Sequence, residues 1–284
     1  MRTAVVDIGS NSTRLLISAV EEDRVIQELE RRSTVTRLGD GVDGSGRLGQ
    51  EAMERVYRAL TEYRELIDSH DVENPVAVLT SAVRDAANGQ QFADTVKGRF
   101  GLRPHILTGD QEAELTFLGA TSERDPDDTT PTVVIDIGGG STEIVIGTGR
   151  QAGFHVSTQA GVVRQTERHI DSDPPTQSEL DELAADVRSL LEEGVPPDQR
   201  RAVRHSIAVA GTATSLAAIA QGLDPYDPAK VHGYRMDRRE CERILGHLAE
   251  IPLKERREVI GLHPDRAPTI VAGVVILLRA LELF

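Results

Sequence analysis

The hydrophobic pattern at the start of the chain predicts three antiparallel strands followed by a helix. Apolar and β-branched residues alternate or run together over 4–8, 13–20 and 24–33, and short turns rich in Gly, Ser, Asn or charged residues separate these segments. After a glycine-rich loop at 37–49, apolar residues recur with a period near 3.6 over 50–67. This second period indicates a helix that buries one face.

The next 50 residues alternate between the two periods. They predict strands at 76–80 and 103–107, and helices at about 88–98 and 110–121. Alternation of this kind is typical of an α/β domain in which parallel strands extend a sheet. The fold class expected from the pattern is therefore α/β.

The acidic, proline-bearing segment "TSERDPDDTTPT" at 121–132 is the best candidate for a domain boundary. We therefore expect one domain over 1–124 and a second, with extra helices, over 125–284. The second repeats the strand, glycine turn and strand, and adds a third strand near 152–158. Its later elements are predicted as a helix at 176–193, a strand at 205–211, a helix from Thr212, and helices at 237–249 and 264–283.

The two predicted domains share a local repeat. When Asp7 and Asp136 are aligned, "AVVDIGSNSTRLLI" at 4–17 and "VVIDIGGGSTEIVIG" at 133–147 have Asp, Ile, Gly, Ser and Thr in register. A repeat that spans a whole strand–turn–strand unit predicts two domains of related architecture.

Composition narrows the possible partners and location. The formal charge of −14 argues against a nucleic-acid or anionic-membrane surface. The single cysteine, Cys241, excludes an intrachain disulfide and suits a reducing compartment. The start "MRTAVVDIGS" lacks an apolar signal core, and the apolar stretch 270–278 is too short to span a bilayer. We expect a soluble, cytoplasmic protein that binds neither nucleic acid nor membrane.

The two glycine turns carry the strongest chemical signal. A strand that runs into Gly-Gly-Gly-Ser-Thr leaves backbone N–H groups unshielded, and such a concavity suits phosphate oxygens. Asp7 and Asp136 stand where each strand meets its turn, and either carboxylate suits Mg²⁺ shared with phosphate. The alternative is a plain hairpin in which the Asp caps the loop. Neither turn has the lysine of a Walker loop.

Three further positions suggest phosphate chemistry, each with an ordinary structural alternative. Gly211 and Thr212 join a strand to a helix, whose N-terminus attracts anions. Arg84 follows a strand end, where it would clamp phosphate or pair with an acid such as Asp85. Glu112 lies in the first turn of a predicted helix, where it would act as a general base or simply stabilise the helix dipole.

Taken together, the motifs resemble the exopolyphosphatase/guanosine pentaphosphate phosphatase (Ppx/GppA) family over essentially the whole chain. In order, they are "DIGSNSTRLLI", "TSAVRDAAN", "TGDQEAELTFLG", "VVIDIGGGSTEIVIG", "AGTATSLAAI", "KVHGY" and "GLHPDRAPTIVAG". The resemblance implies two ribonuclease-H-like domains of the actin, sugar-kinase and chaperone-ATPase type with a cleft between them, in the short two-domain form.

The resemblance also implies roles for individual residues. Glu112 matches the base that activates water, although Gln111 replaces the acid that usually precedes it. Asp136 and Glu143 match metal-associated acids for Mg²⁺ or Mn²⁺, with Asp7 as a third candidate. The residues that match phosphate-binding positions are Gly9, Ser10, Asn11, Ser12, Arg84, Gly138, Gly139, Gly140, Ser141, Thr142, Gly211 and Thr212.

The function expected from this resemblance is metal-dependent hydrolysis of the terminal phosphoanhydride of inorganic polyphosphate. The alternative substrate is guanosine pentaphosphate, (p)ppGpp; the scarcity of aromatic residues, with no Trp, favours polyphosphate. A small-molecule kinase and a non-catalytic sensor of polyphosphate or alarmone remain rivals. The apolar helix at 269–283 would support a homodimer or lie buried between the domains. From the resemblance we also expect a further strand of the kind "VSEHDILDG" beyond "LRALELF".

Overall fold

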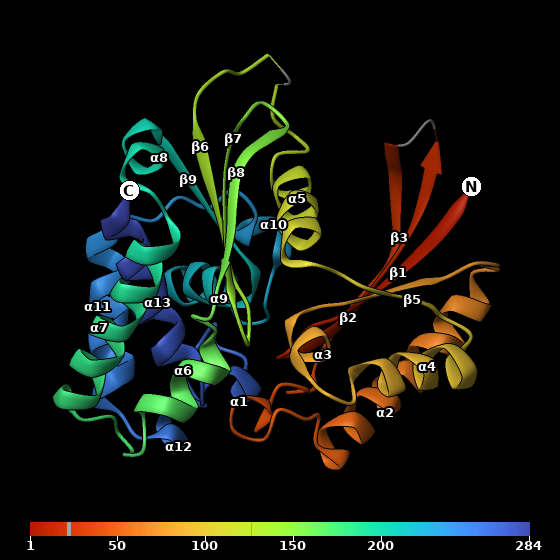
Figure 1. Cartoon of the computed structure of the whole chain (residues 1–284), viewed down its shortest axis with the longest axis horizontal. Helices are drawn as coiled ribbons and strands as arrows, with labels where there is room; N and C mark the ends of the chain where they lie inside the picture. Colours follow the sequence, from red (N-terminus) through yellow and green to blue (C-terminus); the bar gives the residue numbers. More distant parts are fainter. Residues whose placement is uncertain (22–23, 126) are drawn as a thin grey trace. The chain divides into compact units, whose positions relative to one another are not determined.

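The computed structural model describes residues 1–21, 24–125 and 127–284 of the chain. Pro126, in the expected boundary segment, lies outside the described residues. The chain divides into two compact units, Met1–Gly109 and Asp110–Phe284. Each unit contains one sheet (Figure 1), so the two-domain α/β expectation holds, and the two are described separately below.

The first unit contains a five-stranded sheet in the order β3-β2-β1-β4-β5. Strands β1 to β3 are antiparallel, and β4 and β5 add in parallel, as the sequence predicts. Its elements are β1 (Arg2–Ile8), β2 (Ser12–Glu21), β3 (Arg24–Val35), α1 (Val42–Ser45), α2 (Gln50–Ser69), β4 (Val76–Leu79), α3 (Ser81–Asp85), α4 (Gly89–Phe100) and β5 (Arg103–Ile106).

The core of the first unit follows from strand alternation. Ala4, Val6 and Ile8 are buried every second residue along β1, and they belong to the same apolar cluster as the buried faces of α2 and α4. The two helices are joined by a stacked aromatic pair, Tyr57 and Phe92, with ring centroids 5.6 Å apart. This packing fixes the end of β1, where the first glycine turn begins.

The second unit contains a four-stranded sheet in the order β8-β7-β6-β9. Three antiparallel strands are again followed by a parallel one, so the repeat seen in the sequence is a repeat of topology. Its elements are α5 (Gly109–Ala120), β6 (Thr132–Ile137), β7 (Thr142–Thr148), β8 (Gln151–Thr158), α6 (Val162–His169), α7 (Gln177–Gly194), α8 (Pro197–Ala202), β9 (His205–Val209), α9 (Ala210–Gln221), α10 (Pro228–Val231), α11 (Arg238–Glu250), α12 (Leu253–Arg256), the 3₁₀ turn η1 (Pro264–Arg266) and α13 (Ile270–Leu283).

Helices cover both faces of the second sheet. Val133 and Ile135 of β6 face the apolar cluster that contains α7 and α13, while Val134, between them, faces α5. Helices α7, α11 and α13 lie together on one side of this sheet, and α5 lies on the other (Figure 1). Because β6 is buried on both faces, its sequence reads as a continuous apolar run.

Helix α5, apart from its first residue Gly109, belongs to the second unit, and the division of the chain therefore falls at the start of this helix. Ala113 and Phe117 are fully buried against Val134 and Val145 of the sheet. The ring of Phe117 occupies the space over Gly147, where an added Cβ would lie 2.6 Å from it. The segment at 121–132, expected to separate the domains, thus lies inside the second unit.

The late apolar helix is used inside the second unit. Most of α13, from Ile270 to Leu278, is buried in the cluster that contains α7 and α11. Its apolar residues therefore pack within the second unit. Within the described part of the chain, no helix has both the length and the apolar character required to cross a bilayer.

A buried glutamine in α6 leads to a stability prediction. Gln165 is fully buried, and neither its amide nitrogen nor its amide oxygen has a partner among the described residues. Replacing it with the similarly long Met should raise the free energy of unfolding by about 1–3 kcal/mol, the usual cost of unpaired buried polar groups. Urea unfolding measures this change.

Gln221 provides the matched control. Its amide nitrogen donates to the carbonyls of Ala217 and Lys230, at 3.0 and 3.2 Å. Gln221→Met should therefore lower stability or leave it unchanged. Equal losses in the two variants would show that the Gln165 amide is satisfied in solution.

Candidate active site

The second glycine turn, Gly138–Ser141, is held from one side by the start of α6. The backbone N–H of Gly138 donates to Ser141 O (2.9 Å) and closes the turn. Val162 N and Val163 N donate to the carbonyls of Gly138 and Gly139, at 2.9 and 2.8 Å. Among the described residues, the N–H groups of Gly139, Gly140 and Ser141 donate to no acceptor. The turn therefore presents three successive donors, an arrangement that suits phosphate oxygens.

The first glycine turn, Gly9–Ser12, has the same design in the first unit. Gly9 N donates to Ser12 O (3.0 Å), just as Gly138 N does to Ser141 O. Backbone donors of the following segment hold its carbonyls: Gly39 N binds Ser10 O at 2.8 Å, and Thr36 N binds Asn11 O at 3.0 Å. The Ser10 hydroxyl lies 3.0 Å from that of Ser81 and is buried with it. Both turns are thus fixed through their carbonyls.

Three carboxylates gather beside the second turn. Asp136 and Glu143 are directly opposite each other across the β6–β7 hairpin. Glu112, in the first turn of α5, is near enough for its charge to raise the pKa of Glu143. Thr116, one helical turn further along α5, donates to Asp136 Oδ2 at 3.4 Å. Packing of α5 on the sheet therefore brings the predicted base and two of the three predicted metal ligands together within one unit.

The ionisation of Glu143 is strongly perturbed. Burial, and then the charges of Glu112 and Asp136, raise its pKa to about 8. Its side chain is 1% exposed and accepts a hydrogen bond from the Ser157 hydroxyl (2.9 Å) and another from Ser141. The pKa is raised because nearby negative charge and lost hydration both disfavour the ionised form. A bound cation would reverse that preference.

Asp7 occupies the position of Asp136 in the first unit, but its surroundings differ. It is opposite Arg14 across the β1–β2 hairpin, with Arg14 Nη1 3.6 Å from Asp7 Oδ2. Desolvation raises the pKa of Asp7, and the Arg14 charge opposes that rise. The first hairpin thus places an acidic residue opposite a basic one, whereas the second places two acidic residues opposite each other. The negative charge of the second pair is therefore not neutralised across the hairpin, and a bound cation would stabilise it.

The donor set in the second unit fits Mg²⁺ or Mn²⁺. Within the described ranges, no group of three or more His, Cys, Asp or Glu side chains is arranged as a metal centre. Mg²⁺, however, is usually held by one or two carboxylates together with water and substrate phosphate. Asp136 and Glu143 supply hard oxygen ligands next to the donor turn, which suits that mode.

Several predicted phosphate-binding side chains have partners inside the fold. The Thr142 hydroxyl donates to Ala160 O at 2.5 Å. The Thr212 side chain packs closely against Gly273 of α13, where there is no room for a Cβ atom. Arg84 Nη1 donates to Leu107 O (3.0 Å), and its Nε lies 3.6 Å from Asp85 Oδ1. The ion pair with Asp85, the structural alternative for Arg84, is therefore formed.

Three residues that sequence reasoning did not single out adjoin the candidate site. Ser157 binds Glu143, as described above, and Arg164 Nε donates to Gly140 O at 2.9 Å. The guanidinium of Arg266 lies against Gly211, 2.1 Å from where a Cβ would stand. Each of the three reaches the site from a part of the sequence that follows the glycine turn. Arg266 lies within the quoted motif "GLHPDRAPTIVAG", whereas Ser157 and Arg164 lie outside every motif that pointed to the site.

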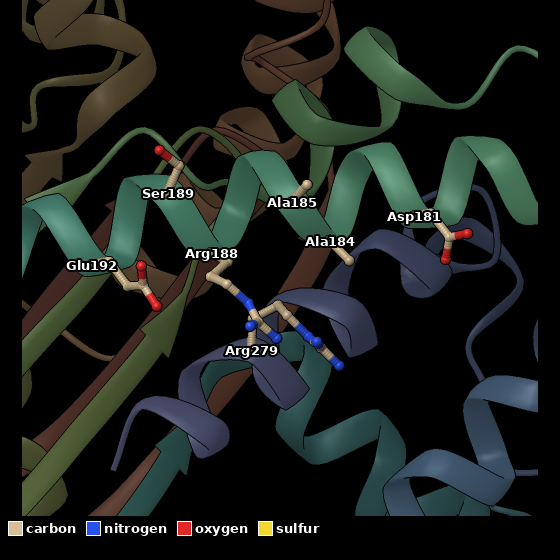
Figure 2. Close-up of a pocket in the computed structure, with 7 residues that line it drawn as sticks. All are labelled: Asp181, Ala184, Ala185, Arg188, Ser189, Glu192 and Arg279. Atoms are coloured by element: carbon tan, nitrogen blue, oxygen red, sulfur yellow. The ribbon is translucent and has the colours of Figure 1, made fainter.

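A groove elsewhere in the second unit does not share these residues. It has a volume of about 480 Å³ and lies between α7 and α13, where Arg188 extends from α7 to the neighbourhood of Arg279 (Figure 2). Both guanidinium groups pair with Glu282, at 3.1 and 2.8 Å. Since Asp181 and Glu192 also line the groove, its acids offset its arginines, and it gives no specific attraction for phosphate.

The raised pKa of Glu143 makes unfolding pH-dependent. An ordinary glutamate, with a pKa near 4.5, represents the unfolded chain. The folded state therefore holds a proton between about pH 4.5 and 8 that the unfolded state releases, and stability falls as pH rises through this range. In chelator, wild type should lose about 3 kcal/mol more than Glu143→Gln between pH 5.5 and 8.5.

Urea unfolding of both proteins at the two pH values measures this difference. Addition of Mg²⁺ at pH 8.5 should restore stability to wild type and have less effect on Glu143→Gln, because the cation stabilises the ionised carboxylate. Parallel pH profiles for the two proteins in chelator would show that Glu143 ionises normally in the folded state.

Two related α/β units, one with a turn of unengaged amide donors beside an acidic cluster, form an arrangement that suits an enzyme acting on phosphate groups. A model of the Ppx/GppA phosphatase family matches residues 15–284. Exopolyphosphatase 2 of Mycobacterium tuberculosis is 37% identical over 283 residues, which cover 97% of this chain and 88% of that protein. The chain therefore belongs to the Ppx/GppA phosphatase family.

Solved structures agree with this membership. The crystal structure of an exopolyphosphatase-like protein superposes with a TM-score of 0.91 and is 37% identical in sequence. The match covers 99% of this chain and 88% of the chain in that structure. The structure of the Aquifex aeolicus Ppx/GppA family member has a TM-score of 0.81 and 34% sequence identity. That match covers 100% of this chain and 90% of the Aquifex aeolicus chain. The expected family, the α/β fold with two sheets, and the enzyme class, a phosphoanhydride hydrolase, are confirmed.

Proposed function

We propose that this chain is an exopolyphosphatase that hydrolyses the terminal phosphoanhydride of linear inorganic polyphosphate and releases orthophosphate. The observation that supports this proposal most strongly is the donor turn Gly139–Ser141 beside the acids Glu112, Asp136 and Glu143. Phosphoryl transfer depends mainly on positioning and charge neutralisation, and this arrangement supplies donors, cation ligands and a base together.

Each group has a distinct task in this proposal. The N–H groups of the turn bind oxygens of the terminal phosphoryl, and Glu112 orients a water and accepts its proton during in-line attack on phosphorus. Asp136 and Glu143 hold Mg²⁺ or Mn²⁺, and a bound divalent cation supplies charge neutralisation for the phosphate oxygens. Within the first unit, Gly9 to Ser12 and Arg84 are candidates for phosphate contacts, and Asp7 is a candidate cation ligand.

Polyphosphate is the preferred substrate for two reasons. The relative from Mycobacterium tuberculosis is named an exopolyphosphatase, and the chain has few aromatic residues with which to stack a guanine base. Guanosine pentaphosphate presents a similar terminal phosphoanhydride and is the alternative substrate. We further propose a cytoplasmic location, which suits both substrates.

The test is phosphate release from short polyphosphate, guanosine pentaphosphate and ATP in parallel, with Mg²⁺, with Mn²⁺ and with chelator. We expect metal-dependent release that is fastest from polyphosphate. Faster release from guanosine pentaphosphate would establish the alternative substrate. Transfer from ATP to an acceptor would indicate a kinase, and binding of polyphosphate with no release would indicate a sensor.

A further inference from the structure

The peptide planes of the second glycine turn are fixed one by one by α6. The carbonyls of Gly138 and Gly139 accept from the backbone N–H groups of Val162 and Val163. The next carbonyl, that of Gly140, accepts instead from a side chain, Nε of Arg164, at 2.9 Å. Three consecutive carbonyls of the turn therefore face α6.

The direction of each carbonyl determines the direction of the next N–H group. In a trans peptide the C=O and the N–H that follows it point in opposite directions. With the carbonyls of Gly138, Gly139 and Gly140 directed at α6, the N–H groups of Gly139, Gly140 and Ser141 point away from it. These are the three donors that have no acceptor within the described residues.

We propose that Arg164 is a positioning residue for phosphate binding: by holding the Gly140 carbonyl it directs the Ser141 N–H toward the phosphoryl group. The proposal rests on the proposed function, in which this turn binds the terminal phosphoryl. Two of the three peptide planes are held by backbone N–H groups, which every side chain except that of proline leaves in place. The third is held by one side chain, so it can be tested alone.

The first turn shows that the side chain has a specific task. There the carbonyls of Ser10 and Asn11 are held by the backbone N–H groups of Gly39 and Thr36. At the matching position of the second turn, the described residues show the Gly140 carbonyl held by the Arg164 side chain, where the Asn11 carbonyl of the first turn is held by backbone. Arg164 therefore contributes an element of the site that the internal repeat does not supply.

The direct test follows the amide signals of the turn in the full-length chain labelled with ¹⁵N-glycine and ¹⁵N-serine. Orthophosphate, titrated into wild type, should shift the signals of Gly139, Gly140 and Ser141. In Arg164→Met, which keeps the stem but lacks the donor, the Ser141 shift should be lost while those of Gly139 and Gly140 remain. Arg164→Lys should recover part of it.

Arg200 gives a matched control in the same unit. Its Nε also donates to a backbone carbonyl, that of Val195, at 2.6 Å, and it too is half-buried. Arg200→Met therefore removes the same kind of bond at a place without a role in the site.

With polyphosphate, Arg164→Met should lower kcat/KM by about 10- to 100-fold, mainly through kcat, as expected when a donor is misplaced. Arg200→Met should stay within twofold of wild type.

The two readouts separate the outcomes. A Ser141 signal that still responds to phosphate in Arg164→Met, or an equal fall in kcat/KM for Arg164→Met and Arg200→Met, would overturn the positioning role. If phosphate moves none of the three signals in wild type, the role is overturned as well. If the Ser141 response is lost in Arg164→Met while wild type shows all three responses but releases no phosphate, the role of Arg164 is supported and the proposed function is contradicted. Should Arg164→Met fail to fold, Arg164→Lys carries the same measurements.

Discussion

Replacement of Glu112 by glutamine should lower kcat for phosphate release by about 10²–10⁴-fold and leave KM nearly unchanged, the usual loss when a general base is removed. The amide keeps the size and polarity of the side chain but cannot accept a proton at neutral pH. Because the amide donors of Gly139, Gly140 and Ser141 are untouched, substrate should still bind. Steady-state kinetics with short polyphosphate measure both constants.

Glu114 is the control, since it lies on the same helix and is exposed. Glu114→Gln should retain wild-type kcat. A second readout comes from Glu143: the charge of Glu112 helps to raise the pKa of Glu143, so Glu112→Gln should lower that pKa. Wild-type kcat in Glu112→Gln would remove Glu112 from the mechanism, whatever happens to the ionisation of Glu143.

The sequence predicted the parts of the fold that are governed by local pattern. The hairpins around Asp7 and Asp136 were predicted from β-branched runs that meet at glycine turns, and both have the expected antiparallel register. The parallel strands β4 and β5 were likewise expected from the alternation of strand and helix. A strand was also expected at the position of β9, and the structure shows that it pairs in parallel with β6. In each strand or helix, the spacing of the apolar residues follows from which face of that element is buried, so the sequence alone reveals it.

Features that depend on long-range packing were not predictable in the same way. The apolar residues of α5 form a helical pattern, but a pattern does not tell which sheet the helix covers. Only the burial of Ala113 and Phe117 on the second sheet shows that Glu112 belongs with Asp136 and Glu143. The short helices α8, α10 and α12 lie in segments too brief for periodicity to reveal.

Side chains that support the site were missed for a related reason. Ser157 is adjacent to Glu143 only because β8 pairs with β7, and Arg164 reaches Gly140 only because α6 returns over the turn. Neither residue is part of the repeated motif. The repeat identified the two turns, but it did not reveal which residues surround them. Only the structure shows that Asp7 is opposite Arg14, whereas Asp136 is opposite Glu143.

Gly161→Ala should damage both activity and stability, because the start of α6 lies in contact with the second turn. A Cβ at Gly161 would stand 2.2 Å from Gly140 C, 2.3 Å from Gly139 O and 2.4 Å from Ser141 N. These are backbone atoms, so either the turn or the helix must move. We expect a loss of about 1–3 kcal/mol in the free energy of unfolding. Displacement of the donor turn should also lower kcat/KM by about 100-fold or more.

Gly153→Ala separates this effect from a general intolerance of alanine. Gly153 lies in β8 of the same unit, and its added Cβ would meet only Ile146 O, at an ordinary 3.5 Å. Activity and stability of that variant should remain close to wild type. If Gly161→Ala keeps wild-type kcat/KM while losing stability, the turn tolerates displacement and its N–H groups do not bind the reacting phosphoryl. A large fall in kcat/KM confined to Gly161→Ala would tie catalysis to the contact between α6 and the turn.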